Sequence, residues 1–494
     1  MSLRFDPVDL ELPDGHFIGG KLSRTGEPLP VLRPSDGQPL GHIPEADEDV
    51  VDEAVNAAHL AWKTSGWATG SPRDRGRVLR RWADLIDAET KSLAQLEAAS
   101  STRPVSEAFA SDVPFTAEAI RFFGELADKL GGDVAATDHD SFGFMASESY
   151  GVVGAIAPWN FPLSMCSWKV GPALAAGNAV VLKPSELTPY STVRLAQLAI
   201  EAGMPAGIFN VIHGRGHLGG AALVRHPRIA KVSFTGSTRV GAEIMGLIAQ
   251  TGIKPVTLEL GGKSPQLVFE HVHDLEYTAD CIVRGFTANA GQACIAGTRL
   301  IAHEALVEPL VEAVIRRIQK FAPAKTWDEV AGFAPIINRK QADRIHALVM
   351  ESRTLGAEAQ CGGGFFENAG GGAFYKPTIL RRVSDDMPAV REELFGPVLT
   401  VQTFRDESEG IELAKHPTYG LAAGIHTSDV GQALRAMRQI SAGTVWINRY
   451  NRSGDMIIPT GGFGQSGIGK DLGVQAVEAN LRLKSVLIDT RLRA

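Results

Sequence analysis

The chain has 494 residues, more than one hydrophobic core normally supports, so two or more lobes are expected. Hydrophobic residues make up 44% of it and charged residues 21%, and the formal net charge is −7. Nucleic acids and anionic membranes favour a basic face on their partner, so the composition argues against both.

The N-terminal region and the cysteines predict a reduced, cytoplasmic protein. Four acidic residues precede the first apolar stretch, which is not the pattern of a secretory signal, and no apolar run reaches the roughly 18 residues that span a bilayer. The cysteines form no CxxC pair, so we expect neither a disulfide framework nor a metal site; they are Cys166, Cys281, Cys294 and Cys361.

The first 130 or so residues are expected to be mostly helical, with amphipathic stretches over 48–65 and 75–99. From Tyr150 onward, β-branched runs alternate with amphipathic ones. Strands are predicted over 152–157, 179–183, 208–212, 231–234, 256–260 and 266–269, with helices over 164–176, 190–202 and 238–250. This alternation predicts an α/β fold with a doubly wound parallel sheet, whose ligands bind beyond the carboxyl ends of the strands.

A second alternating region starts after Gly261-Gly262 and extends to about Gly467, which predicts a second α/β lobe. The segments 133–149 and 480–490 alternate apolar and polar residues but belong to neither lobe, which favours a small sheet that pairs subunits. We therefore expect a first domain over 1–132 and 150–261, a second over 262–467, and a small β oligomerisation element over 133–149 and 468–494.

Cys294 lies among small residues just after a predicted helix, where a substrate carbon has room to approach the sulfur. A thiolate is the nucleophilic form of cysteine, so such a site needs a field that lowers the thiol pKa. Taken alone, a single cysteine is more often buried filler than a nucleophile.

Two further side chains follow predicted strands. Glu259 ends an apolar strand beside Gly261-Gly262, where a carboxylate can act as a general base or simply cap the next turn. Asn160 stands between two prolines, where its amide can donate to a developing oxyanion or bond its own backbone as a turn residue.

Other strand ends carry groups suited to a nucleotide. Lys183 and Glu186 follow one strand, and a carboxylate there grips a ribose hydroxyl and repels a 2′-phosphate. Gly236 and Ser237 begin a helix whose N-terminus suits a pyrophosphate, with Ser237 as the cap. A GxGxxG run over 214–219 also follows a strand, but such a run is weak evidence by itself and we set it aside.

Together these residues resemble the aldehyde dehydrogenase superfamily from about Ile18 to the C-terminus. The motifs that carry the resemblance are, in chain order, PWNFP, KPSE, FTGS, ELGGKSP, GQACIAGTR, EELFGP and TGGFGQSG. The resemblance implies a Rossmann-like cofactor domain followed by a catalytic domain. It implies Cys294 as nucleophile, Glu259 as base, Asn160 as oxyanion donor and Lys169 in proton relay. The cofactor residues implied are Trp159, Lys183, Glu186, Gly236, Ser237, Glu393 and Phe395.

The implied chemistry is oxidation of an aldehyde to the acid through a thiohemiacetal and a thioester on Cys294. NAD is the expected cofactor because of Glu186, with NADP accepted as well, and a homodimer or homotetramer is expected. Three rivals stay open. They are a CoA-acylating dehydrogenase, a cysteine esterase that needs no cofactor, and a non-catalytic protein that keeps the fold.

Within the family the chain looks most like gamma-glutamyl-gamma-aminobutyraldehyde and aminoaldehyde dehydrogenases. The substrate would then be an omega-amino or gamma-glutamylamino aldehyde, with Asp455 attracting a cation at the mouth of an aromatic funnel. The aromatic residues expected there are Phe161, Trp168, Tyr450 and Phe463. The alternative is that Asp455 pairs with an arginine and the aromatics are ordinary core. The chain departs from the family at 100–104 and at Thr460, which affects substrate choice but removes no catalytic group.

Overall fold

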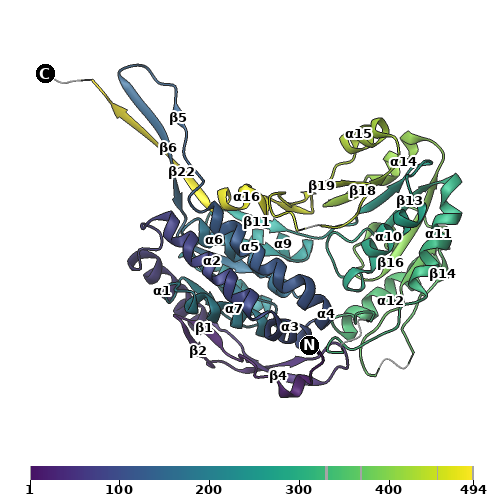
Figure 1. The fold of residues 1–494 in the computed structure, drawn as a ribbon, viewed down its shortest axis with the longest axis horizontal. Coiled ribbons are helices and arrows are strands. Elements are labelled where there is room, and N and C mark those ends of the chain that lie inside the picture. The colour runs from purple at the N-terminus through teal and green to yellow at the C-terminus, as the bar shows by residue number, and fades with distance from the viewer. Residues whose placement is uncertain (1, 329–331, 368–369, 453, 492–494) are drawn as a thin grey trace.

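The structure is a computed structural model that describes residues 2–328, 332–367, 370–452 and 454–491. Two α/β lobes, each built on its own sheet, lie beside one another, and a β arm extends away from both (Figure 1). The fold class predicted from the sequence is confirmed.

The first lobe surrounds an eight-stranded sheet. Its strand order is β2 (Lys21–Ser23), β1 (His16–Ile18), β9 (Phe209–Val211), β8 (Ala179–Lys183), β7 (Val152–Ile156), β10 (Ile229–Thr235), β11 (Val256–Glu259) and β21 (Gly467–Ile468). The five strands from β9 to β11 run parallel, and the outer strands are antiparallel. The carboxyl ends of β7, β8, β10 and β11 therefore meet at one edge, where a ligand of a doubly wound sheet binds.

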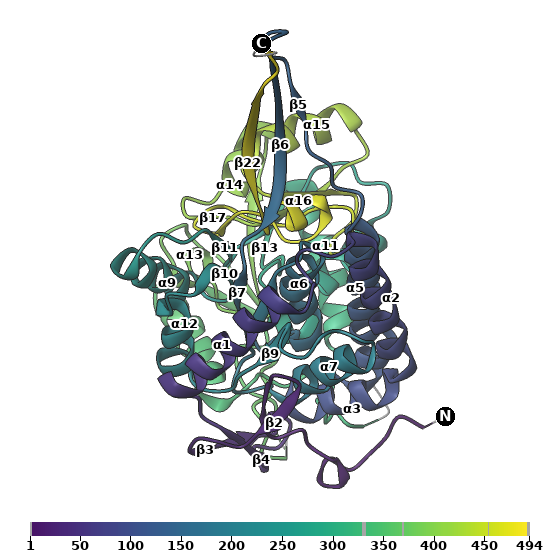
Figure 2. The same cartoon turned by 90° about the vertical axis from the view of Figure 1, so that its left-hand side faces the viewer.

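Helices cover both faces of this sheet because the crossovers run in opposite directions from β7. Helices α6 (Pro162–Ala175) and α7 (Tyr190–Glu201) link β7 to β8 and β8 to β9, while α8 (Ala221–Arg225) and α9 (Thr238–Thr251) link β9 to β10 and β10 to β11. Helix α1 (Glu48–Thr64) packs on β7, β8 and β9. Helices α2 (Pro72–Ala88) and α5 (Val113–Leu126) lie side by side over α6 (Figure 2). Every residue of α6 is buried.

The second lobe surrounds a seven-stranded sheet. Its order is β14 (Glu358–Cys361), β15 (Thr378–Arg381), β16 (Val398–Phe404), β13 (Arg299–His303), β12 (Pro265–Val268), β18 (Ala422–His426) and β19 (Thr444–Ile447), and only β14 is antiparallel to its neighbour. Its helices are α10 (Leu275–Thr287), α11 (Glu304–Ile318), α12 (Arg339–Thr354), α13 (Pro388–Arg391), α14 (Glu407–Ala414) and α15 (Val430–Gln439). The chain passes between the lobes at Gly261-Gly262, directly after β11.

The arm consists of β5 (Val134–Ala135), β6 (Ser141–Ser149) and β22 (Leu481–Asp489). Strands β6 and β22 pair antiparallel along their full length, from Ser149 opposite Leu481 to Ser141 opposite Asp489. The arm carries exposed apolar side chains, namely Val134, Phe142, Leu483, Leu487 and Ile488.

The structure corrects the sequence prediction in three places. The N-terminal region is not mostly helical at its start, because β1, β2, β3 (Pro28–Leu32) and β4 (Pro39–Pro44) precede α1. The amphipathic stretch over 75–99 is divided at Glu89 between α2 and α3 (Thr90–Ser100). Residues 468–478, expected in the oligomerisation element, instead pack on the first lobe, since β21 pairs with β11 and α16 (Gly473–Glu478) packs on α6.

Candidate active site

Cys294 follows a tight turn that holds it at the junction of the two lobes. After α10, Asn289, Ala290 and Gly291 take left-handed backbone angles, with φ of 50°, 53° and 73°. Such angles disfavour non-glycine residues and persist only where the surroundings enforce them. A Cβ atom at Gly291 would lie 2.3 Å from the carbonyl oxygen of Gly396, so only glycine fits there. The strained turn fixes the direction in which the following thiol points.

Burial and two nearby carboxyls keep the thiol of Cys294 protonated. Burial raises its pKa to about 12, and the carboxyls of Glu393 and Glu259 act in the same direction. The guanidinium of Arg452 and the backbone N–H of Ile295 oppose them. A thiolate therefore requires either added positive charge beside the sulfur or a base that takes the proton.

Asn160 lies beside this loop and borders the same space as Cys294. Its Nδ2 donates to the carbonyl oxygen of Gln292 at 2.9 Å, and Nδ2 of Asn289 donates to the carbonyl oxygen of Asn160 at 2.9 Å. A carboxamide nitrogen carries two hydrogens, so one remains for an oxygen next to the sulfur.

Glu259 ends β11, and its Oε1 is buried with no hydrogen-bond partner among the described residues. Burial raises its pKa well above the ordinary range, Asp471 adds to the rise, and Lys169, Arg452 and Lys470 oppose it. A carboxyl whose pKa approaches neutrality is suited to proton transfer. Lys169 is itself paired with Asp471, with 2.7 Å between Nζ and Oδ2, and both side chains are buried.

Two cavities meet at Cys294 and Asn160. One, of about 570 Å³, contains five of the expected cofactor residues: Trp159, Gly236, Ser237, Glu393 and Phe395. The other, of about 360 Å³, contains Glu259, Phe161 and Trp168. The sulfur thus stands between a space for a cofactor and a space for a substrate.

The cofactor-side cavity depends on close contacts of Glu393. The backbone N–H of Gly262 donates to Glu393 Oε1 at 3.0 Å, and a Cβ atom at Gly261 would lie 2.3 Å from Oε2. Burial raises the pKa of Glu393 to about 7, and the Gly262 hydrogen bond opposes the rise. Phe395 has a left-handed φ of 56°, and its ring stands edge-on to Trp159 with centroids 5.2 Å apart.

Ser237 caps α9, since its hydroxyl accepts from the backbone N–H of Val240 at 3.4 Å. The first turn of α9 therefore presents its free N–H groups at the carboxyl edge of the sheet, where an anion is stabilised.

Lys183 and Glu186 lie at the end of β8, outside the cavity that borders Cys294. Lys183 Nζ donates to the carbonyl oxygens of Gly214 at 2.7 Å and Pro184 at 2.9 Å, and lies 3.6 Å from Glu186 Oε2. The GxGxxG run that we set aside thus borders Lys183, and its end overlaps a helical turn over Gly216–Gly220.

The expected substrate residues divide into two groups. Phe161 and Trp168 line the substrate-side cavity together with Phe115. The structure does not bring Tyr450, Asp455 and Phe463 to that cavity. Tyr450 is buried behind the nucleophile loop and donates its hydroxyl to the carbonyl oxygen of Ile295 at 2.7 Å. Phe463 is 47% exposed, in the short β20 (Phe463–Gly464), which pairs with β17 (Tyr419–Gly420).

Sequence reasoning missed several residues that border the cavities. On the cofactor side these are Met165, Gln341, Arg344 and Tyr419, and on the substrate side Arg103 and Arg452. Arg103 belongs to the stretch over 100–104 where the chain departs from the family, so that departure pointed to a residue of the substrate-side cavity. It pairs with Asp112 at 2.6 Å and Glu107 at 2.8 Å, and lies over the ring of Phe161.

Across the described ranges no helix combines the length and apolar character needed to cross a membrane. Within the same ranges, no group of three or more histidine, cysteine or acidic side chains is arranged to hold a metal ion.

The model of the aldehyde dehydrogenase family matches residues 22–486 of the chain. The chain is 38% identical over 483 residues to the NADP/NAD-dependent aldehyde dehydrogenase PuuC of Escherichia coli, covering 97% of each protein. It superposes with a TM-score of 0.95 on gamma-glutamyl-gamma-aminobutyraldehyde dehydrogenase from Burkholderia cenocepacia, at 39% identity over 98% of both chains. The NAD+ complex of aldehyde dehydrogenase from Bacillus cereus also gives a TM-score of 0.95, at 37% identity, covering 99% of this chain and 100% of that one. The chain therefore belongs to the aldehyde dehydrogenase family, whose members are oxidoreductases that act on aldehydes.

Proposed function

We propose that this protein oxidises an aldehyde to the carboxylic acid with NAD(P)+ through a covalent intermediate on Cys294. The observation that carries the proposal is the position of Cys294 where two cavities meet, with the amide of Asn160 and the carboxyl of Glu259 bordering the same space. A thiol, an oxyanion donor and a base arranged together suit acyl chemistry that ends in hydrolysis.

In the first half of the reaction, Glu259 takes the thiol proton of Cys294 as the sulfur bonds to the aldehyde carbon and the carbonyl oxygen becomes an anion. Glu259 releases this proton before the second half, which returns it to the carboxylate. The free hydrogen of Asn160 Nδ2 and the backbone N–H of Cys294 hold that oxygen. A bound nicotinamide dinucleotide supplies the acceptor for the hydride that this carbon loses, and the product of that loss is a thioester on Cys294.

In the second half, Glu259 takes a proton from water as the water oxygen bonds to the thioester carbon. The carbon–sulfur bond breaks, the acid leaves and the sulfur regains a proton. Glu259 suits this role because its raised pKa lets it exchange protons near neutral pH. Lys169 and Asp471, ion-paired and in electrostatic contact with Glu259, are the candidates for passing the proton onward.

The residues of the cofactor-side cavity fit a dinucleotide. The free N–H groups of α9 suit a pyrophosphate, and Glu393 suits the hydroxyls of the nicotinamide ribose. Outside this cavity, at the end of β8, Lys183 with Glu186 suits the adenosine ribose. Glu186 opposes a 2′-phosphate, so NAD+ is the preferred cofactor. The relatives support a nicotinamide dinucleotide as the cofactor, since one is named NADP/NAD-dependent and another holds NAD+.

The relatives also bear on the substrate. Of the two aldehyde classes suggested by the sequence, the gamma-glutamylamino class is better supported, because one relative of this chain, at 39% identity, is named gamma-glutamyl-gamma-aminobutyraldehyde dehydrogenase. An omega-amino aldehyde is less favoured, because its ammonium group would need a carboxylate in the cavity. Glu107 and Asp112 already pair with Arg103, and Glu259 is the proposed base.

The arm formed by β5, β6 and β22 is the proposed surface for self-association. Leu483 and Leu487 are each 72% exposed on a strand that projects from both lobes, which is costly for a monomer in water. Leu483→Lys combined with Leu487→Lys should reduce the molar mass measured by light scattering, and an unchanged mass would remove the arm from the interface.

The proposed function is tested by following NADH formation with an aldehyde panel, with and without CoA. We expect activity that needs no CoA, produces free acid, and is lost in Cys294→Ala. Activity that requires CoA would favour the acylating dehydrogenase, and hydrolysis of esters without aldehyde oxidation would favour the esterase.

A further inference from the structure

The substrate-side cavity contains an arginine that no step of the proposed reaction uses. Arg452 lies on the chain segment after β19 and borders the cavity together with Cys294 and Glu259. Its guanidinium lies over the ring of Trp168, 5.2 Å from the centroid. A guanidinium that covers an aromatic face keeps its N–H groups in its own plane, pointing away from the ring.

One nitrogen of this guanidinium has no hydrogen-bond acceptor among the described residues. Nη2 of Arg452 is buried and has no hydrogen-bond partner in the part of the chain that the structure describes. Buried donors are rarely left in this state, and each unsatisfied one invites an explanation such as a missing ligand. Its charge acts on Cys294 and Glu259, so the guanidinium lies close to where an aldehyde would react.

The other charged side chains of the cavity are already committed. Arg103 binds Asp112 through two hydrogen bonds, of 2.6 and 3.2 Å, and pairs with Glu107 at 2.8 Å. Glu107 is half exposed, so water screens its charge. Burial keeps Glu259 largely protonated until the pH approaches its raised pKa. Arg452 therefore supplies the one unmatched charged donor of this cavity among the described side chains. The other unmatched donors in the lining, Trp168 Nε1 and Thr235 Oγ1, are neutral.

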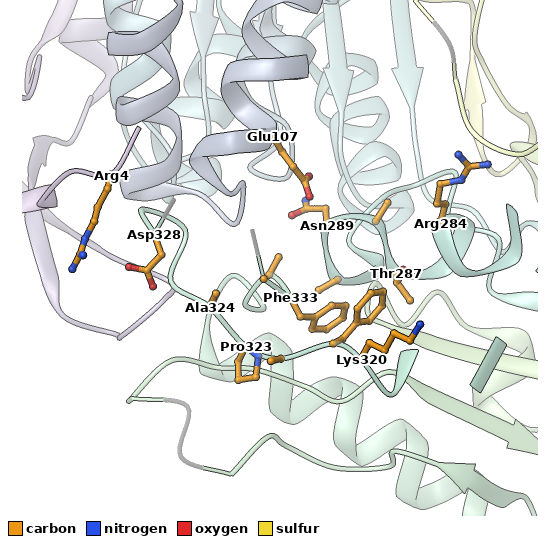
Figure 3. Close-up of a pocket in the computed structure, with 16 residues that line it drawn as sticks. Arg4, Glu107, Arg284, Thr287, Asn289, Lys320, Pro323, Ala324, Asp328 and Phe333 are labelled. Carbon is orange, nitrogen blue, oxygen red and sulfur yellow. The ribbon is translucent and has the colours of Figure 1, made fainter. Parts of the chain in front are cut away.

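A cavity that adjoins this one also carries cations. A larger cavity of about 1030 Å³ shares Glu107 and Ala288 with it, so the two adjoin. Figure 3 shows Lys320 on the wall of this adjoining cavity, near Thr287 and Phe333, and Arg284 farther from them. Arg284 donates to the sulfur of Cys281 and lies over the ring of Tyr277, not against a carboxylate. Together with Arg4, these cations outnumber the two carboxylates of the lining, Glu107 and Asp328, so this neighbouring cavity does not repel an anion.

We propose that Arg452 binds an anionic group of the substrate, so that the enzyme prefers aldehydes that also carry a carboxylate. This inference rests on the proposed function of the same site. A planar guanidinium forms two parallel hydrogen bonds with a carboxylate, which would satisfy Nη2 and orient the aldehyde end toward Cys294. Phe115, Phe161 and Trp168 then contact the carbon chain between the two groups.

The test compares three aldehydes of matched chain length and different charge: succinic semialdehyde, butanal and 4-(trimethylammonio)butanal. In the wild type, kcat/KM should be at least ~10-fold higher for succinic semialdehyde than for butanal, about 1.4 kcal/mol, and lowest for the cation. Arg452→Met should lower the ratio of succinic semialdehyde to butanal by at least ~10-fold. Arg452→Lys, which keeps the charge but not the fork, should restore part of the ratio.

The matched control is Arg73→Met, because Arg73 is an exposed arginine on α2, and its ratio should equal that of the wild type. Succinate should inhibit the wild type competitively against butanal and inhibit Arg452→Met at least ~10-fold less strongly. This inhibition requires only that the variant still oxidises butanal.

Two results would overturn the inference. One is a wild type that prefers butanal or the cationic aldehyde to succinic semialdehyde. The other is an Arg452→Met variant in which all three substrates lose activity equally, which would assign Arg452 to the electrostatics of Cys294. A wild type that oxidises none of the aldehydes would refute the proposed function instead, so the two failures are distinct.

Discussion

The substitution Gly261→Ala tests how the cofactor-side cavity is held. The added Cβ would lie 2.3 Å from Glu393 Oε2 and 3.3 Å from Oε1, so the carboxylate must rotate away from the backbone N–H of Gly262. Hydrogen bonds to charged groups contribute about 1.5–3 kcal/mol, so kcat/KM for NAD+ should fall by ~10–150-fold. The effect should appear mainly as a higher KM, because the three atoms nearest the new methyl group all belong to Glu393.

The pH profile gives a second readout of the same variant. The Gly262 N–H bond holds down the pKa of Glu393, which burial raises to about 7. When that bond breaks, only the charges of Lys263 and Arg344 still oppose burial, so the carboxylate ionises at higher pH. The profile of kcat/KM for NAD+ should therefore shift to higher pH in Gly261→Ala.

The control is Gly246→Ala in α9, where an added Cβ meets nothing within 4 Å. Alanine is favoured over glycine inside a helix, so this variant should keep full activity and unfold at the same or a higher temperature. A double-mutant cycle with Glu393→Ala should show that the two substitutions are not additive, since both remove the same contact. Additive losses, or Gly261→Ala with KM and kcat within about twofold of the wild type, would refute the reasoning.

Three further predictions follow from the site. Asn160→Ala should lower kcat by about 100-fold or more while leaving NAD+ binding near wild type, because removing one oxyanion donor typically costs that much; a loss confined to KM would place Asn160 outside the oxyanion site. The rate at which iodoacetamide labels Cys294 should be low at pH 8 and should still increase beyond pH 9, since the thiol pKa is about 12. Peptide mapping measures this rate, with Cys294→Ala as the background. Removing a negative charge favours the thiolate, so Glu393→Gln should speed labelling at pH 8; slower labelling would contradict the stated electrostatics. Glu186→Ala should raise kcat/KM for NADP+ relative to NAD+ by removing the repulsion of a 2′-phosphate, and an unchanged ratio would remove Glu186 from cofactor choice.

Much of the fold could be predicted because each parallel strand of the first lobe is a short buried run bounded by turn residues. The strand predicted over 179–183 matches β8 at both ends, with Gly177 before it and Pro184 after it. The N-terminal strands were missed because β1 and β2 are only three residues long and β3 and β4 each contain two prolines. Strand β1 is stabilised by pairing with β9, where Phe17 lies opposite Val211, a partner nearly two hundred residues away. No local pattern reports such a pairing.

The candidate site could likewise be predicted only where a local sequence pattern fixes the position of a residue. Residues at strand ends, such as Asn160 and Glu259, could be placed because topology brings the carboxyl ends of parallel strands together. Tyr450 and Phe463 could not, because they lie on the loop-rich segment after β19, where tertiary packing alone decides which side chain faces the cavity. Arg452 was missed for another reason: its sequence neighbourhood does not distinguish a buried donor beside Trp168 from an exposed arginine.

The central claim is that Cys294 carries the substrate as an acyl group that Glu259 helps water to release. Glu259→Gln keeps the shape of the side chain and removes the base, so mixing this variant with NAD+ and an aldehyde should give a burst of about one NADH per active site, then a stall. Mass spectrometry of the stalled protein should find the added mass of the acyl group on the peptide that contains Cys294. A uniform slowdown without a burst, or an acyl group on any other residue, would contradict the account.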